Sequence, residues 1–310
     1  MEKSVSHWAP SPEQISELDR LFSDYRFQVN SFFRPFVLQY DSALLGADEA
    51  AYLKMVELST KMTLVGHACT LLTGFPFDER RRNISHLYGG CCFLADGFID
   101  DFGPERARDY LARLEILLSH GRFEAQTPRE RLFYIILANL FAERNVLSPM
   151  LRQAICLLFM AQQQDVQLRF ETRKLMAQSK AQRLQTLKVC AGHRSGHAIN
   201  VLTRFLVPQF PLAYVRALYA AGALIMHIDD HGDCYADLHH GRITYMNQLK
   251  RPAERLRIIF IQVMRRIEAD LPANAGRDLL QAFLYRYYAT RIKKHHLEKR
   301  RIGERWTVYE

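Results

Sequence analysis

Three aspartates at a four-residue spacing, Asp229, Asp233 and Asp237, follow an apolar run over residues 220–226. Four residues turn an α-helix by about 400°, so each step drifts only about 40° around the axis. The three carboxylates are therefore expected to project as a row from one helix face, with no Lys or Arg at those spacings to neutralise them. Such a row repels itself unless a cation lies between its members. Because Mg²⁺ prefers oxygen ligands and commonly shares them with substrate phosphates, the row predicts a magnesium site.

A second acidic pair, Asp96 and Asp100, interrupts an otherwise apolar segment over residues 93–102. Four residues apart, the two carboxylates are expected on one helix face, about 6 Å apart along the axis. Carboxylates on two facing helices can hold several Mg²⁺ ions at the mouth of a helical bundle and stabilise charge on an anionic leaving group. Zinc is a poorer match, because the cysteines lack ligand spacing and the histidines form no HExxH motif.

The elements that must position these carboxylates are predicted to be helices. Apolar residues recur at helical spacing through most of the chain, and no alternating strand pattern is bounded by hairpin signals. Ser11-Pro12 and Thr127-Pro128 each place a capping hydroxyl before a proline at the first helical position. We predict about ten helices, separated by Gly and Pro breakers. With no repeat or linker, residues 1–310 are predicted to form a single all-α domain.

Composition excludes several classes of protein. Hydrophobic residues make up 48% of the 310 residues, which is typical of a globular chain. No stretch approaches the roughly 18 apolar residues of a membrane helix, and the first residues lack a secretory signal, so we expect a cytoplasmic protein. The six cysteines are interpreted as buried free thiols. The net charge of +9 fits an anionic small substrate, and a basic run over residues 291–301 is interpreted on its own as a solvated helix end.

The two acidic segments resemble the metal motifs of class I terpene synthases. The segment Asp229-Asp230-x-x-Asp233-x-x-x-Asp237 is similar to the family's (N/D)Dxx(S/T)xxx(E/D) motif, with Asp in place of the usual hydroxyl residue at Asp233. The segment from Asp96 to Asp101 resembles DDxxD, with Gly97 replacing the second Asp. The motifs occur in the family's usual order and at about its usual separation. The resemblance covers these motifs, the helical pattern and the length.

This resemblance implies a fold and a reaction. The fold would be a single large antiparallel helical bundle of the class I isoprenoid synthase type with a central apolar cavity. The reaction would be a lyase reaction, in which Mg²⁺, three ions in the family, and basic side chains trigger departure of diphosphate from farnesyl or geranylgeranyl diphosphate. The carbocation left behind would cyclise in a cavity that excludes water. The catalytic metal ligands would be Asp96, Asp100, Asp229, Asp233 and Asp237.

The resemblance also indicates residues that bind diphosphate and line the cavity. The family carries a diphosphate-sensing Arg before the second motif, on a helix that breaks near the site. The region over residues 182–196 matches that place, with Gly192 and Gly196 as markers of the break. The candidates for binding diphosphate are Arg183, Lys188, Arg194 and, late in the chain, Arg305. The candidates for lining the cavity are Phe93, Phe98 and Gly192.

Two other functions stay open. A squalene or phytoene synthase, or another prenyl transferase, would use the same fold, and the DxxxD pairs Asp96–Asp100 and Asp233–Asp237 fit that pattern. A helical nucleic-acid-binding protein would use the basic C-terminal run, but it leaves the acidic row unexplained. We therefore expect a prenyl diphosphate as partner, no nucleic acid, no stable membrane insertion and, as an open alternative, a homodimer.

Overall fold

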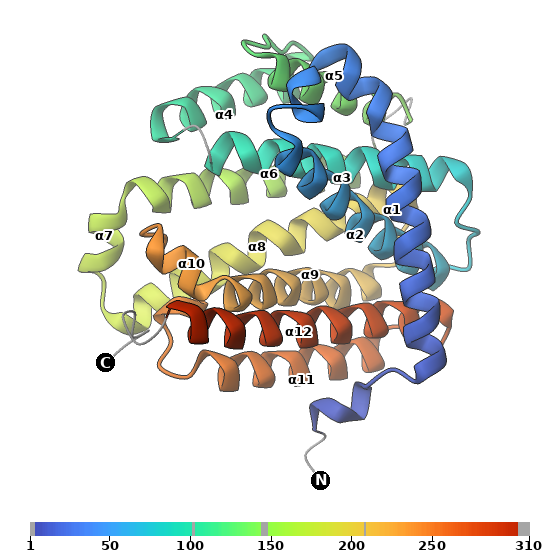
Figure 1. Cartoon of the computed structure of the whole chain (residues 1–310), viewed down its shortest axis with the longest axis vertical. Helices are drawn as coiled ribbons and strands as arrows, with labels where there is room; N and C mark the ends of the chain where they lie inside the picture. The colour runs from blue at the N-terminus through green and yellow to red at the C-terminus, as the bar shows by residue number, and fades with distance from the viewer. Residues whose placement is uncertain (1–3, 101–102, 144–147, 208, 303–310) are drawn as a thin grey trace.

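The computed structural model describes residues 4–100, 103–143, 148–207 and 209–302 (Figure 1). Every regular element in these ranges is a helix, as the sequence predicts. Three short 3₁₀ helices cover Val5–Trp8, Ser42–Leu45 and Met246–Gln248. The α-helices are α1 (Pro12–Tyr40), α2 (Glu49–Leu72), α3 (Glu79–Asp100), α4 (Gly103–His120), α5 (Pro128–Ala142), α6 (Pro149–Phe170), α7 (Thr172–Ala177), α8 (Lys180–Leu206), α9 (Leu212–Gly232), α10 (Cys234–His239), α11 (Pro252–Asp270) and α12 (Ala275–Ile302).

The predicted helix starts are confirmed. At α1 the Ser11 side chain accepts a hydrogen bond from the backbone N–H of Gln14, whose side chain accepts one from the Ser11 N–H, so two free donors are satisfied. At α5 the Thr127 hydroxyl accepts from the N–H of Glu130. The structure has twelve α-helices in its described part instead of about ten, because α7 and α10 are separate helices of six residues each.

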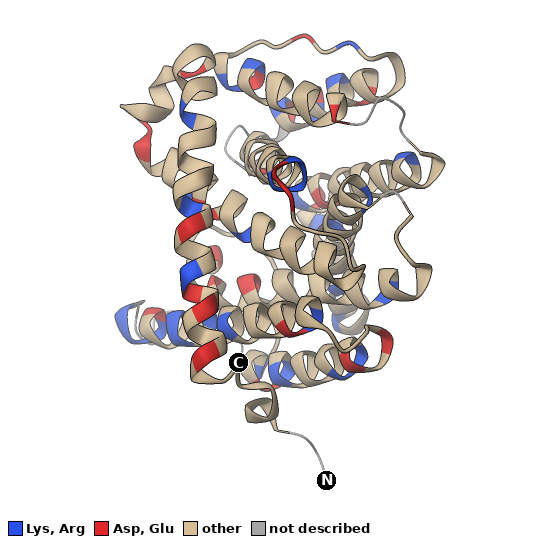
Figure 2. Cartoon of the chain, turned by 90° about the vertical axis from the view of Figure 1, so that its right-hand side faces the viewer, with Lys and Arg blue, Asp and Glu red and all other residues tan. Residues whose placement is uncertain are grey.

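The helices pack into a layered bundle. Helices α8, α9, α12 and α11 lie one beside the next in Figure 1, and the long α1 crosses at one side. Helix α3 packs against α2 and α5, and α6 packs against α8. Helix α1 carries both acidic and basic residues along its length (Figure 2), and Arg20 pairs with Glu17 and Asp24 at helical spacing.

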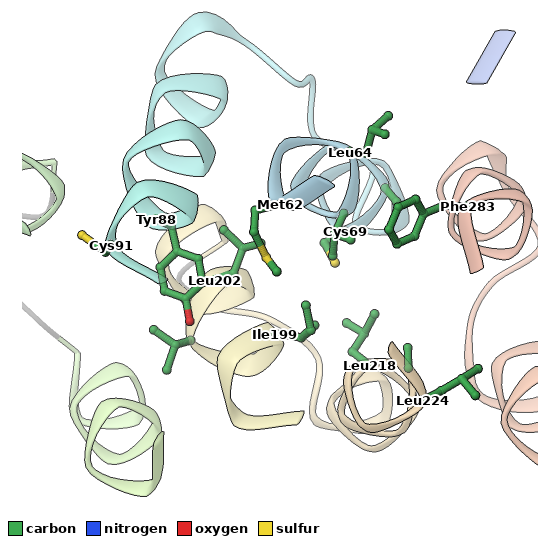
Figure 3. Close-up of a cluster of buried hydrophobic side chains, with 14 of the residues drawn as sticks. Met62, Leu64, Cys69, Tyr88, Cys91, Ile199, Leu202, Leu218, Leu224 and Phe283 are labelled. Carbon is green, nitrogen blue, oxygen red and sulfur yellow. The ribbon is translucent and has the colours of Figure 1, made fainter. Parts of the chain in front are cut away.

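One connected core contains buried residues from all twelve helices, which is the pattern expected of a single domain. Figure 3 shows its centre, where α2, α3, α8, α9 and α12 meet. Side chains there include Met62, Cys69, Tyr88, Leu202 and Phe283. Four of these helices, α3, α8, α9 and α12, carry charged residues of the site described below.

The predicted break in the helix that carries Arg194 is wrong, because α8 runs without interruption from Lys180 to Leu206. Its glycines serve packing instead. A Cβ on Gly196 would lie 2.6 Å from the ring of Tyr219 on α9, so only glycine lets that ring approach. Gly192 lies over Tyr219 and Ala223 in the same interface.

The structure tests two predictions made from composition. No helix in the described ranges combines the length and apolarity that crossing a membrane would need. The interpretation of the cysteines as buried thiols is correct for Cys69, Cys91, Cys190 and Cys234, whereas Cys92 is partly exposed and Cys156 is exposed.

Candidate functional site

The aspartate row lies where α9 ends. Helix α9 stops at Gly232, Asp233 caps it, and α10 begins at Cys234, so the expected single helix is interrupted within the row. The spacing nevertheless persists, because the N–H of Asp233 donates to the carbonyl of Asp229 at 3.0 Å and the N–H of Asp237 donates to that of Asp233 at 2.8 Å. Asp229, Asp233 and Asp237 all line one pocket of about 470 Å³, which we call the acidic pocket.

Asp96, near the end of α3, lines the same acidic pocket. Two segments more than a hundred residues apart therefore direct carboxylates at one space, an arrangement that the resemblance to the two metal motifs implies. Asp100 is the last residue of α3, and its side chain lies outside the described residues. Asp230 and Asp165 also line the pocket, so its described residues contribute six aspartates and three arginines.

A second, larger pocket of about 970 Å³ adjoins the first, and we call it the apolar pocket. The two pockets share Asp96, Arg194, Met226, Asp229 and Asp233, so the carboxylates stand at their junction. Beyond the junction the lining is mainly aliphatic and aromatic. Its aromatic residues are Phe22, Tyr88, Phe93, Phe133, Phe141, Phe159, Phe205, Phe283 and Tyr287.

Of the three predicted cavity residues, one lines a pocket and two do not. Phe93 lines the apolar pocket. Phe98 does not line either pocket; it is buried, with its ring centroid 4.7 Å from that of Tyr110 and 5.8 Å from that of Phe133. Gly192 is likewise not a lining residue and packs α8 against α9. For these two residues, ordinary core packing replaces the predicted role.

Helix α12 supplies cations to the α9 aspartates. Arg291 pairs with Asp229 and reaches Asp233 at 3.6 Å, and Lys294 pairs with Asp233. The hydroxyl of Tyr287 donates to Asp229 Oδ1 at 2.6 Å and accepts from Arg291. The interpretation of residues 291–301 as a solvated helix end is therefore wrong at its start. The sequence contains a signal, since Tyr287, Arg291 and Lys294 recur at helical spacing, but it does not name the partners.

Arg194 on α8 pairs with the aspartates on the other side of the junction, which come from α3 and α6. Its guanidinium lies 3.3 Å from Asp96 Oδ1 and 3.1 Å from Asp165 Oδ2, and it lines both pockets. Asp165, on α6, also pairs with Arg169 at 2.8 Å. Sequence reasoning missed Asp165, because its spacing to Arg169 marks an ordinary pair within one helix. Arg194 therefore links α8 to both α3 and α6.

The other predicted diphosphate ligands are not brought to the pockets. Arg183 lies near the start of α8, where it donates to the carbonyl of Met176 at 3.5 Å. Lys188 lies one turn further along α8 and, like Arg183, lines neither pocket. Arg305 lies outside the described residues.

Burial and charge shift several groups at the junction. Burial raises the pKa of the Tyr287 phenol well above its usual value, and the charge of Asp229 adds to the effect. Burial alone would lower the pKa of Arg291, but Asp229, Tyr287 and Asp233 outweigh it and hold the pKa above its usual value. Burial raises the pKa of Asp230, and the like charges of Asp237 and Asp229 raise it further. The raised pKa of Arg291 and the like-charge effect on Asp230 both indicate that the carboxylates at the junction favour nearby positive charge.

The donor set suits a hard cation bound together with a ligand. Among the described residues, no three His, Cys, Asp or Glu side chains form a ready-made group around one ion. The carboxylates are instead spread along the pocket wall. Mg²⁺ usually takes one or two protein carboxylates and completes its shell with water and substrate phosphate oxygens, which requires no such group. Oxygen donors spread along an open wall thus fit Mg²⁺ and do not fit a closed structural zinc site.

Comparisons with known proteins identify no relative: no family model, curated protein or solved structure matches the chain.

Proposed function

We propose that this chain is a Mg²⁺-dependent enzyme that ionises a linear prenyl diphosphate and cyclises the resulting carbocation, as class I terpene synthases do. One observation carries the proposal. Carboxylates from α3 and α9 stand together at the junction between an acidic pocket and a large apolar pocket. A ligand that matches both pockets has a highly anionic head and a long apolar tail.

The acidic pocket would receive the diphosphate. Asp96, Asp229, Asp233 and Asp237 would hold Mg²⁺, which when bound neutralises the diphosphate and the charge that develops on it as it leaves. Arg291 and Lys294 already face these carboxylates and would donate hydrogen bonds to the phosphate oxygens, while Arg194 would hold Asp96 at the junction. Mg²⁺ would add positive charge to that of Arg291 and Lys294 beside the aspartates of the pocket.

The apolar pocket would receive the hydrocarbon chain. Its aliphatic walls exclude water, which would otherwise quench a carbocation. Phe93 on α3 and Tyr287 on α12 line it close to the carboxylates that share the junction. The faces of their rings carry partial negative charge and would stabilise a nearby cation.

Product analysis tests this function and separates it from its alternative. Purified protein is incubated with Mg²⁺ and labelled farnesyl or geranylgeranyl diphosphate, and the extract is resolved by gas chromatography and mass spectrometry. A cyclic C15 or C20 hydrocarbon or alcohol supports a cyclase. A doubled C30 or C40 product would favour a squalene or phytoene synthase reaction, for which the position of both Asp233 and Asp237 in the acidic pocket is the supporting observation. An untouched substrate would contradict both.

A further inference from the structure

Two histidines of α8, His193 and His197, lie one turn apart and on either side of Arg194 in the sequence. Residues four apart share a helix face, so the two imidazoles are neighbours. Their ring centroids are 5.5 Å apart and the ring planes are tilted by 53°. Both side chains are partly exposed, and neither lines the acidic or the apolar pocket. The pair is therefore a group of two imidazoles that the proposed reaction does not use.

The ring nitrogens of this pair have no polar partner in the described part of the chain. The contacts of the two rings are with each other and with the ring of Tyr219 on α9, whose centroid is 5.2 Å from that of His197 and 6.4 Å from that of His193. Of the four ring nitrogens, His197 Nδ1 alone is both buried and without a hydrogen bond. The other three are therefore accessible to a ligand from solvent.

The charge state of the pair favours metal binding. Burial lowers the pKa of His197, and the positive charge of a protonated His193 lowers it further. His197 is therefore neutral at neutral pH, which is the form of imidazole that binds a metal ion. Protons compete little with a metal at such a ring.

The separation of the rings matches that of two imidazoles on one ion. A Zn²⁺–N bond is about 2.0–2.1 Å and the ring centre lies about 1.1 Å behind the nitrogen, so each centroid would be about 3.2 Å from the ion. At a tetrahedral angle two such centroids are about 5.2 Å apart, close to the 5.5 Å of this pair. Among the described residues no third His, Cys, Asp or Glu completes the group, so water would fill the remaining positions.

We infer that His193 and His197 form a two-imidazole site for a borderline divalent cation, Cu²⁺, Ni²⁺ or Zn²⁺, separate from the carboxylates that would hold Mg²⁺. Imidazole nitrogen suits these ions, whereas carboxylate oxygen suits Mg²⁺. A bound ion would cross-link the turn of α8 that also carries Arg194. The inference goes beyond the proposed function and does not depend on it, because neither histidine lines a pocket.

Electron paramagnetic resonance with one equivalent of Cu²⁺, in the presence of excess Mg²⁺, tests the site. All proteins carry Cys156→Ser, which removes an exposed thiol that Cu²⁺ oxidises. We expect hyperfine coupling to the nitrogens of two imidazoles, because a site among the aspartates would supply oxygen ligands alone. His193→Gln and His197→Gln should each weaken Cu²⁺ binding about 100-fold, since the second imidazole of a pair binds intramolecularly.

The exposed neighbours His239 and His240 provide a matched control. Their ring centroids are 5.2 Å apart, but adjacent residues of a helix end do not share a face. The double variant His239→Gln/His240→Gln should therefore bind Cu²⁺ as tightly as the parent protein.

Three results would overturn the inference. The first is a spectrum of the parent protein with one coupled imidazole or none, which decides the question whether or not the variants fold. The second is a loss of affinity in the double variant as large as that in His193→Gln. The third is displacement of Cu²⁺ by Mg²⁺, which would place the ion among the aspartates.

Discussion

The two acidic sides of the junction are neutralised in different ways. On the α6–α8 side, Arg194 and Asp165 have side chains only 13% and 14% exposed, and together with Asp96 they tie three helices together. On the α9–α12 side, Lys294 and its partner Asp233 are 38% and 27% exposed, and Asp229 is 39% exposed beside Arg291 at 19%. A buried pair cannot exchange partners without leaving a desolvated charge, whereas a half-exposed pair exchanges readily. The comparison assigns mainly structural work to the Arg194–Asp165 pair and ligand exchange to the α9–α12 side, and Asp96, whose side chain is 41% exposed, stays accessible to a ligand.

The largest expected effect comes from a change on the α9–α12 side of the junction. Asp229→Asn removes a charge at the junction of both pockets, and we expect kcat/KM with Mg²⁺ and geranylgeranyl diphosphate to fall about 100- to 1,000-fold, the usual loss for one preorganised electrostatic group. Thermal stability should change little. Asp24→Asn, on the outer face of α1, is the matched control. Equal activity of the two variants would remove Asp229 from the reaction.

The buried side is expected to respond through stability. Arg194→Gln leaves Asp165 desolvated beside a single remaining cation, Arg169, so we expect the free energy of unfolding to fall by about 3 kcal/mol in urea titrations. Arg183→Gln, eleven residues earlier on the same helix and outside both pockets, should cost less than about 0.5 kcal/mol. Similar losses for the two variants would contradict the structural role of the Arg194 pair.

A Lys294 variant tests whether the α9–α12 side contributes more to ligand binding than to stability. Lys294→Gln should lower the affinity for Mg²⁺-diphosphate about tenfold, which corresponds to one charge-assisted hydrogen bond. Because its pair with Asp233 is partly exposed, stability should fall by no more than about 1 kcal/mol. The neighbouring Lys293 is exposed, so Lys293→Gln serves as control. A stability loss as large as that of Arg194→Gln would break the distinction between the two sides.

The effect that is smallest at neutral pH appears on acidification and arises ten residues before Asp96 on α3. Burial lowers the pKa of His86 to about 3, and its Nδ1 lies 2.9 Å from the Thr63 hydroxyl. Between pH 6.5 and pH 3 the unfolded chain binds a proton that the folded chain does not, so His86 makes stability fall as pH falls through this range. His86→Gln should therefore reduce the slope of unfolding free energy near pH 5 by about 1.4 kcal/mol per pH unit. Parallel curves for the two proteins would exclude this contribution.

What the sequence predicts well is local. The Ser11 and Thr127 caps, the helical content and the four-residue spacing of Asp229, Asp233 and Asp237 all depend on residues within a turn or two of one another. Even the interruption after Gly232 does not remove the row from the pocket, because backbone hydrogen bonds carry its register across the break.

What the sequence does not predict depends on contacts between helices. Asp165 and Arg194 come from different helices, and so do Asp233 and Lys294, so no spacing encodes either pair. The same limit explains Phe98: an aromatic residue beside a motif can point into the pocket or, as here, into the core behind it. Gly192 and Gly196 indicate a special backbone position, but a close helix crossing and a helix break leave the same glycine signal.

A double-mutant cycle on Asp96 and Asp229 tests the central claim, that carboxylates from α3 and α9 act on one diphosphate. The measurement is Mg²⁺-dependent release of inorganic diphosphate from geranylgeranyl diphosphate by the unaltered protein, Asp96→Asn, Asp229→Asn and the double variant. We predict release by the unaltered protein, a large loss in each single variant and little further loss in the double variant, because residues that act as a unit are strongly non-additive. Losses that simply multiply, or full release by Asp96→Asn, would contradict the account.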